Sequence, residues 1–193
     1  MNTLTSSPPE ICNFKAHFKL NEEVNPHIFF KRLGENIEGQ TVQKLNFTLY
    51  RDPEYKKIVF TVFHGSRHVN VTGARSYSIL EEAINRFNHQ LGENVCISNV
   101  IVDNTTSVGR VWFGEKPFMD LCALEKNAKN NRDKWATTVS LRPDFFPGAV
   151  IRKDKCATII AFSSGKFVIV GAKSSWAIQE AYQRLLALIH PTS

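Results

Sequence analysis

Two basic residues stand immediately before segments with helical periodicity. Arg75 precedes the apolar-periodic stretch Ser76–Gln90, and Lys173 precedes Ser174–Ile189. The positive end of a helix dipole makes a cation unfavourable at that place unless an anion is also bound. A phosphate group would satisfy both the cation and the helix end, so the two bases are predicted phosphate ligands. The alternative for each base is an ordinary solvated side chain at the surface.

The other reactive side chains form no pattern typical of an enzyme. His64 and His68 are four positions apart, but they fall on a predicted hairpin instead of a helix, which disfavours a metal site. Ser163-Ser164-Gly165 lacks the G-x-S-x-G pattern of a nucleophile elbow, and Glu81-Glu82 is typical of a solvated helix face. We therefore predict no catalytic residue, no metal and no cofactor, and we expect a protein that is not an enzyme.

The composition narrows the function classes further. With 24 Lys and Arg against 18 Asp and Glu, the 193-residue chain has a formal charge of +6, which favours a polyanionic partner if the excess gathers on one face. No apolar run of about 18 residues occurs, and residues 1–10 are too polar for a signal peptide, so neither membrane insertion nor export is expected. The four cysteines show no C-x-x-C spacing, which favours reduced thiols and an intracellular setting.

One stretch of sequence occurs twice. Residues 63–75 recur as residues 162–173, and each copy reads as a strand, a tight turn, a second strand and a Gly-Ala-base motif. The match extends upstream, where Arg51 pairs with Arg152. We predict a flexible segment over 1–9, a first repeat over 10–95 and a second repeat over 96–193, which together form one domain.

Each repeat is expected to contain a strand, a short helix, several antiparallel strands and a long helix. Alternating residues in Leu45–Tyr50 and Ile58–Phe63 indicate strands with two unlike faces. The helices predicted over Ser76–Gln90 and Ser174–Ile189 cover one face and leave the other bare. The sequence therefore predicts an α+β fold in which two pseudo-symmetric repeats form a saddle, with a curved antiparallel sheet on the concave side and helices on the convex side.

The two repeats differ in length at two places. Ten positions separate Phe63 from Gly73, but nine separate Phe162 from Gly171, so the first hairpin has one extra turn residue. The second repeat has about fifteen extra residues within Gly114–Trp135. The polar stretch 125–134 inside this insertion is predicted to be a solvated helix end or loop.

The second repeat resembles the TATA-box-binding protein family. Phe146–Arg152 fits the family pattern F-P-G-x-x-x-R, and Phe162–Lys166 followed by Gly171–Lys173 fits its hairpin. The resemblance is looser in the first repeat and covers about residues 10–190. It implies a general transcription factor that binds the minor groove of A·T-rich promoter DNA, bends it and nucleates assembly of the initiation complex.

In this family, apolar side chains enter between base steps and kink the duplex, a mode for which the family is itself a reference example. Counted from Arg51, the fourth wedge position falls on Leu45, although Phe47 shares its strand face. The intercalating residues implied by the resemblance are Leu45, Phe63, Phe146 and Phe162. The alternative is burial of these side chains in the core, which is the usual location of Phe.

Asn13 and Asn99 match the paired central asparagines of the family, whose amides reach acceptors on the floor of the groove. The minor-groove residues implied by the resemblance are Asn13, Thr72, Asn99, Ile101, Val168 and Val170. The expected phosphate ligands, which position the protein without reading sequence, are Arg51, Arg67, Arg75, Arg152, Lys166 and Lys173, with His68 as an alternative to Arg67.

The first repeat is the more polar of the two. Lys15 stands where the second repeat is aligned with Ile101, and Asn70 stands where it has Val168. Apolar contacts form much of the fit to an A·T-rich minor groove, so the preference for a standard TATA element is expected to be altered. These changes also allow an alternative function, a protein-interaction module that has lost or altered TATA binding.

The resemblance also implies protein partners. The residues before the F-P-G motif contact transcription factor IIB in the family, and the corresponding partner-binding residues here are Arg142, Asp144 and Phe145. Arg142 replaces an expected glutamate, which would reject an unchanged partner. Transcription factor IIA-like proteins, the RNA polymerase machinery and double-stranded DNA are the other expected partners, with no membrane, in the nucleus or at the site of viral transcription.

Overall fold

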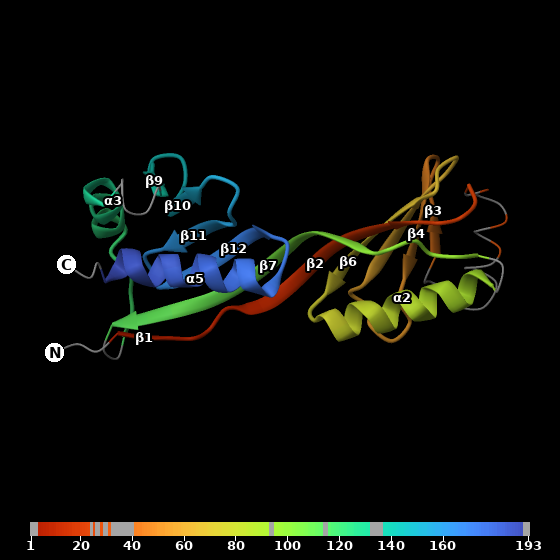
Figure 1. The fold of residues 1–193 in the computed structure, drawn as a ribbon, viewed down its shortest axis with the longest axis horizontal. Coiled ribbons are helices and arrows are strands. Elements are labelled where there is room, and N and C mark those ends of the chain that lie inside the picture. Colours follow the sequence, from red (N-terminus) through yellow and green to blue (C-terminus); the bar gives the residue numbers. More distant parts are fainter. Residues whose placement is uncertain are drawn as a thin grey trace. The chain divides into compact units, whose positions relative to one another are not determined.

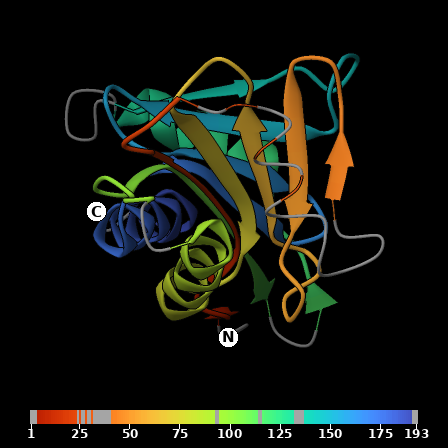
Figure 2. The ribbon, with the colours of Figure 1, turned by 90° about the vertical axis from the view of Figure 1, so that its right-hand side faces the viewer.

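The computed structural model describes residues 4–23, 25, 28, 31, 41–92, 95–113, 116–131 and 137–190. It divides into two compact units. The first unit is Cys12–Asp103, and the second unit is Asn104–Ser193 together with Met1–Ile11. Each unit is an antiparallel sheet with a long helix on one side (Figures 1 and 2).

The first unit contains four strands that neighbour one another through hairpins, and a fifth that arrives from upstream. In sheet order these are β3 (Thr41–Gln43), β4 (Phe47–Arg51), β5 (Val59–Phe63), β6 (His68–Ala74) and the part of β2 (Glu10–Lys19) that begins at Cys12. Helix α2 (Tyr77–Leu91) follows β6 directly. Its N-cap Ser76 accepts a hydrogen bond from the backbone N–H of Ile79 at 3.2 Å, which satisfies one of the unpaired donors at the helix start.

The second unit repeats this plan. Its strands run in the order β7 (Ile101–Phe113), β12 (Lys166–Ala172), β11 (Thr158–Phe162), β10 (Gly148–Lys153) and β9 (Thr137–Leu141), with helices α3 (Leu121–Asn130) and α5 (Ser175–Ile189). Strands β1 (Leu4–Ser6) and β8 (Lys116–Pro117) pair with β7. Helix α5 is capped by Ser174 as α2 is capped by Ser76.

The predicted fold class is confirmed: the protein is an α+β protein with two repeats of an antiparallel sheet and a long helix. The predicted helices begin and end within one residue of α2 and α5. The longer first hairpin is also confirmed, because β5 and β6 are separated by one residue more than β11 and β12.

The core of each unit lies between its sheet and its long helix. In the first unit, the Phe60 and Phe87 rings stack with centroids 4.3 Å apart, joining β5 to α2. In the second unit, the Phe167 and Tyr182 rings stack at 5.6 Å, joining β12 to α5. Burying such rings accounts for much of the stabilisation of the helix on the sheet.

The N-terminal segment corrects one prediction. Residues 4–6, expected within a flexible segment over 1–9, form β1 and pair with Val111–Phe113 of β7. The hydroxyl of Tyr182 donates to Ser6 Oγ at 2.6 Å, so the segment is also tied to α5. Strand β7 extends past the end of its neighbour β12, and β1 pairs with the edge of this extension.

The boundaries of the compact units also differ from the predicted repeats. They fall after Ile11 and Asp103, because β2 and β7 each begin in one unit and continue into the other. Part of the predicted insertion, residues 114–115 and 132–135, lies outside the described residues. The polar stretch that begins at Glu125 is the end of α3, where Lys129 pairs with Glu125 at 3.2 Å.

Candidate nucleic-acid interface

Each sheet has one face that no helix among the described residues of its own unit covers, which we call the open face. In β2, β5 and β6 the buried residues alternate with partly exposed ones, so the alternate side chains point away from α2. The open face of the first unit contains Lys15, His17, Phe47, Leu49, Thr61, Phe63, Asn70 and Thr72. By the same alternation, the open face of the second unit contains Thr106, Val108, Val150, Ile160, Phe162, Val168 and Val170.

Two phenylalanines meet at one end of the second unit's open face. The ring centroids of Phe146 and Phe162 are 5.9 Å apart in an edge-to-face arrangement, and Phe146 is 38% exposed. Gly148 lies opposite Phe162 in the β10–β11 pair. A Cβ atom at Gly148 would lie 2.8 Å from the Phe146 ring and 3.1 Å from the Phe162 ring, so the glycine makes room for both.

The first unit has an aromatic pair at the corresponding place, but its second ring comes from another residue. Phe47, not Leu45, lies opposite Phe63, and their centroids are 6.4 Å apart. Leu45 is 92% exposed. Phe63, Phe146 and Phe162 are thus outside the buried core, with Phe63 and Phe162 partly exposed, while Leu45 does not lie opposite Phe63.

The asparagine pair is assigned differently by the structure. Asn13 Oδ1 accepts a hydrogen bond from the Gly73 N–H at 2.7 Å, and Asn104 Oδ1 accepts one from the Gly171 N–H at 2.6 Å. Both glycines have positive φ and lie where the strand register shifts. Asn104 is therefore the counterpart of Asn13, and the pairing of Asn13 with Asn99 was wrong.

Asn99 lies before β7, where its side chain is exposed. Ile101, 54% exposed, begins β7 and belongs to the first unit, so Thr106 and not Ile101 corresponds to Lys15. The N–H groups of Gly73 and Gly171 donate to the side-chain oxygens of Asn13 and Asn104. The side-chain amide nitrogens therefore remain as donors for other acceptors.

The two open faces differ in chemistry. The residue pairs that occupy corresponding positions are His17 and Val108, Thr61 and Ile160, Asn70 and Val168, and Thr72 and Val170. In the first unit, His17 Nδ1 lies 2.9 Å from both carboxylate oxygens of Asp103. The open face of the first unit is thus more polar than was predicted from Lys15 and Asn70 alone.

The open face of the second unit is hollowed beside the aromatic pair. A hollow of about 430 Å³ is lined by Phe162 and by Val108 and Val168 of neighbouring strands. Arg110 and Lys166, which lie opposite each other in β7 and β12, and Glu10 place two positive charges and one negative charge along its lining. The hollow thus joins apolar side chains of the open face to a rim with a small excess of positive charge.

The predicted phosphate ligands are exposed. They are Arg51, Arg67, Arg75, Arg152, Lys166 and Lys173. Arg75, with Lys56 and Lys57, lines a hollow of about 400 Å³ next to the start of α2. Neither long helix has an acidic residue in its first turn, so neither helix supplies an anion for its own N-terminal end.

The predicted partner-binding residues form an exposed turn before β10. The backbone N–H groups of Phe145 and Phe146 both donate to the carbonyl of Arg142, at 3.0 and 2.9 Å. This turn leaves Phe145 87% exposed, while Phe146 turns toward Phe162. The side chains of Arg142 and Asp144 are exposed on the same turn.

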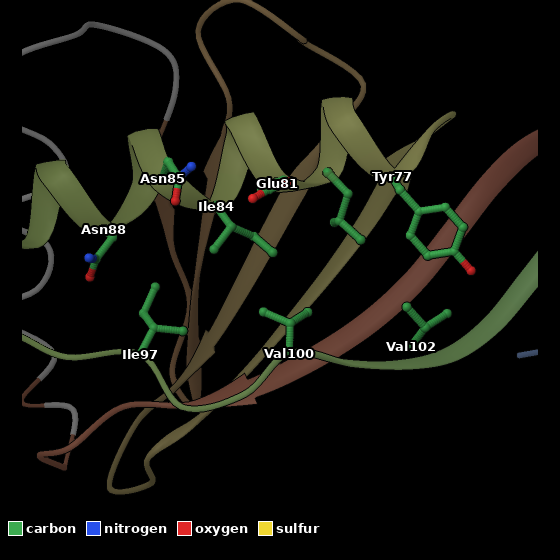
Figure 3. A pocket seen from close by; sticks show the side chains of 9 residues that line it. Tyr77, Glu81, Ile84, Asn85, Asn88, Ile97, Val100 and Val102 are labelled. Carbon is green, nitrogen blue, oxygen red and sulfur yellow. The ribbon is translucent and has the colours of Figure 1, made fainter. Parts of the chain in front are cut away.

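A groove lies on the helix side of the first unit. It has a volume of about 560 Å³ and runs between α2 and the segment 97–102 (Figure 3). Tyr77 and Val100 are exposed at its edge, and Ile97 lines it. Asn88 Oδ1 is buried there without a hydrogen-bond partner among the described residues.

Neither a metal centre nor a membrane span is found within the described ranges. No group of three or more His, Cys, Asp or Glu side chains there is placed to hold a metal ion. His64, considered above as a ligand, instead bridges the Leu45 carbonyl and the Thr48 hydroxyl, at 3.1 and 2.8 Å. No helix in those ranges is both long and apolar enough to cross a membrane.

Comparison with known proteins gives consistent matches to one family. Residues 120–191 match the family model described as transcription factor TFIID, or TATA-binding protein. The chain is 30% identical over 145 residues to a TATA-box-binding protein of Pyrococcus abyssi, a match that covers 71% of this chain and 66% of the relative. The chain thus spans slightly less than two thirds of that relative's length.

Two further comparisons cover more of the chain. A TATA-box-binding protein of Methanocaldococcus jannaschii is 27% identical over 172 residues, covering 82% of this chain and 87% of the relative. The solved structure of Methanococcus jannaschii TBP superposes with a TM-score of 0.68 at 24% identity, covering 97% of this chain and all of the solved one. This likeness concerns the fold.

Proposed function

The chain belongs to the TATA-box-binding protein family, and from that premise we propose that the open faces of its two units bind the minor groove of A·T-rich promoter DNA and bend it. Such binding would nucleate assembly of the transcription initiation complex. The protein would then act as a general transcription factor, and not as an enzyme, wherever its promoters are transcribed.

The aromatic pair at one end of each open face is the observation that carries this proposal. Large apolar rings are costly to expose, so a partly exposed pair such as Phe146 and Phe162 marks a surface that another molecule covers. In a minor groove, such a pair has a base step to enter, and the energy of unstacking is offset by the additional contacts of the bent duplex.

Replacing Phe162 with alanine tests the proposal. We expect the wild-type protein to increase energy transfer between dyes at the two ends of an A·T-rich duplex. We expect Phe162→Ala to weaken binding about 10- to 100-fold, because the stacking of one aromatic ring on a base contributes that factor to the affinity. Titration at several salt concentrations would separate the wedge effect from phosphate contacts, which set the salt slope.

Phe145→Ala is the matched control, because it removes an adjacent and more exposed ring that lies on the turn and not on the open face. It should leave bending unchanged. A wild-type protein that leaves the A·T-rich duplex unbound at low salt would contradict the proposal. The protein-interaction module would then be the better account.

The two amides that are held by glycine N–H groups would read the groove floor. Adenine N3 and thymine O2 are acceptors, so the amide nitrogens of Asn13 and Asn104 would donate to them. The valines of the second unit's open face would exclude the guanine amino group by size. The polar first unit would tolerate a less uniform A·T sequence.

Changing each of these asparagines to aspartate would separate DNA binding from folding. A carboxylate still accepts the N–H of Gly73 or Gly171, but it cannot donate and it repels the DNA. We expect Asn13→Asp or Asn104→Asp to weaken binding by about tenfold or more, with little change in the melting temperature. Calorimetry and fluorescence titration would measure the two effects.

Asn99→Asp is the control for that experiment, because Asn99 lies outside the sheet. A loss of binding from Asn99→Asp as large as that from Asn104→Asp would contradict the reassignment of the pair. Equal small effects of all three changes would contradict a role for these amides in the groove.

The exposed turn before β10 is the proposed site for a transcription factor IIB-like partner. Arg142 supplies a positive charge, and Phe145 supplies an apolar side chain with no cover in the described structure. A partner that fits this turn would carry an acidic group facing Arg142. Transcription factor IIA-like proteins and the RNA polymerase machinery are the further partners that family membership suggests.

The groove beside α2 favours a second role, in binding protein. Its apolar edge at Tyr77 and Val100 and the unpaired Asn88 Oδ1 suit a protein segment with one apolar side chain and one N–H donor. This surface lies on the helix side of the first unit, away from its open face. It would therefore remain available while DNA is bound.

A further inference from the structure

We propose that Phe47, and not Leu45, is the DNA-intercalating partner of Phe63 in the first unit. The intercalating residue would then lie two positions later in the sequence than its counterpart in the second unit, while its ring occupies the corresponding place beside the shared phenylalanine. This inference rests on the proposed function and identifies a specificity-determining residue of the same site.

Corresponding strand pairs place different residues opposite the shared phenylalanine. In the second unit, Gly148 lies opposite Phe162. In the first unit, Phe47 lies opposite Phe63. Phe47 therefore occupies the position of Gly148, and Leu45, two residues earlier, occupies the position of Phe146.

The ring of Phe146 reaches forward from its own position over Gly148. This is why an added Cβ at Gly148 would lie 2.8 Å from a carbon of that ring. The space above position 148 is thus filled by the Phe146 side chain. In the first unit the residue at this position carries its own ring, so no room remains for a ring that extends from position 45.

The two aromatic pairs have nearly the same geometry. The centroids are 5.9 Å apart with a 60° interplanar angle for Phe146 and Phe162, and 6.4 Å apart with 59° for Phe47 and Phe63. Two pairs of phenylalanine rings with nearly the same inclination therefore stand at corresponding ends of the two open faces. A base step that accommodates one pair would accommodate the other.

The turn before β4 holds Leu45 away from this pair. His64 Nδ1–H donates to the Leu45 carbonyl at 3.1 Å, and its Nε2 lies 2.8 Å from the hydroxyl of buried Thr48. The Lys44 N–H donates to the Phe47 carbonyl at 2.8 Å and closes the turn. The side chain of Leu45 is consequently 92% exposed at the tip of this turn.

Single truncations give the first test, on an A·T-rich duplex with 2-aminopurine placed in turn at each step of the bound site. The fluorescence of this base rises where stacking is lost. We expect Phe47→Ala to abolish the signal at one end of the site and to weaken binding about 10- to 100-fold, as Phe63→Ala does, while Leu45→Ala changes binding less than about twofold.

A paired substitution keeps the test independent of folding. Phe47→Gly alone removes the ring and should remove the signal at that end. Leu45→Phe combined with Phe47→Gly recreates the arrangement of the second unit, and we expect it to restore the signal and at least tenfold of the lost affinity. Thermal unfolding of each variant shows how much of any loss comes from instability.

The outcomes distinguish this inference from the proposed function. Loss of one signal with Leu45→Ala and its retention with Phe47→Ala would overturn the inference while leaving DNA bending intact. Failure of the double variant to restore the signal, with folding unchanged, would overturn it as well. An unbent duplex with the wild-type protein would remove the proposed function itself, and the inference with it.

Discussion

Gly73→Ala is expected to destabilise the first unit by about 3–5 kcal/mol, the sum of a left-handed backbone cost and a forced backbone movement. Gly73 has a φ of +101°, which side chains with a Cβ rarely adopt. An added Cβ would lie 2.0 Å from the Lys57 carbonyl oxygen, and a backbone atom cannot rotate away. Urea unfolding would measure the change.

Gly171→Ala is the matched control for this substitution. Gly171 has a φ of +82° and the same hydrogen bond to an asparagine, but no atom lies within 4 Å of its added Cβ. It should lose only the conformational part, about 1–2 kcal/mol. Equal losses at the two glycines would contradict the view that the Lys57 carbonyl decides the difference.

Arg86→Met is expected to destabilise the protein by about 2–4 kcal/mol, because it leaves a buried carboxylate without its counter-ion. Asp52 is 1% exposed and accepts hydrogen bonds from Arg86 Nε at 3.1 Å and Nη2 at 3.3 Å. Partial burial acts to lower the pKa of Arg86, but the hydrogen bond and charge of Asp52 outweigh it and raise that pKa. Thermal unfolding at pH 7 would measure the loss.

Arg184→Met is the matched variant in the second unit, with the opposite expectation. Arg184 occupies the place of Arg86 but is only 9% exposed, and its Nε and Nη1 atoms have no hydrogen-bond partner in the described part of the chain. Its Nη2 donates to the Ala157 carbonyl at 2.8 Å. Lys153, which replaces Asp52, pairs with Glu180 instead.

A methionine of similar length would remove this poorly paired cation at the cost of one hydrogen bond. We expect Arg184→Met to leave stability unchanged or to raise it by about 1 kcal/mol. A loss as large as that of Arg86→Met would show that the guanidinium of Arg184 is paired in solution. Comparing the two variants in one unfolding series would remove differences of condition.

The expected differences between the two glycines and between the two arginines both involve the loop that connects β4 to β5. The connection from β4 to β5 is two residues longer than the connection from β10 to β11, as their strand registers show. The longer loop carries Asp52 and brings Lys57 over Gly73. Because the second unit lacks two loop residues, Gly171 stays open. Arg184 lacks a carboxylate for a different reason, since Lys153 stands in the place of Asp52.

Much of the fold was predictable because the repeat is local in sequence. The strand–turn–strand–glycine unit and the two helices follow from alternation, helical periodicity and capping serines, all of which act within a few residues. The extra hairpin residue was predictable for the same reason. The strand at residues 4–6 was not, since its stability comes from pairing with a strand more than 100 residues away.

The candidate site was predictable only in part. Phe63, Phe146 and Phe162 were identified from their motif and lie outside the core. Asn99 was matched with Asn13 by its place in the family pattern, but the property that Asn13 shares with Asn104 is a hydrogen bond to a bulge glycine. That bond joins residues 60 or 67 positions apart and has no local signal.

By itself the sequence determined the class of fold, the repeat and the family, because these depend on residue patterns that each repeat carries within itself. Only the tertiary structure decided which asparagine matches Asn13, that Phe47 stands beside Phe63, and that His17 faces Asp103. Strand register determines all three, since a shift of one or two residues changes which side chains meet across a sheet.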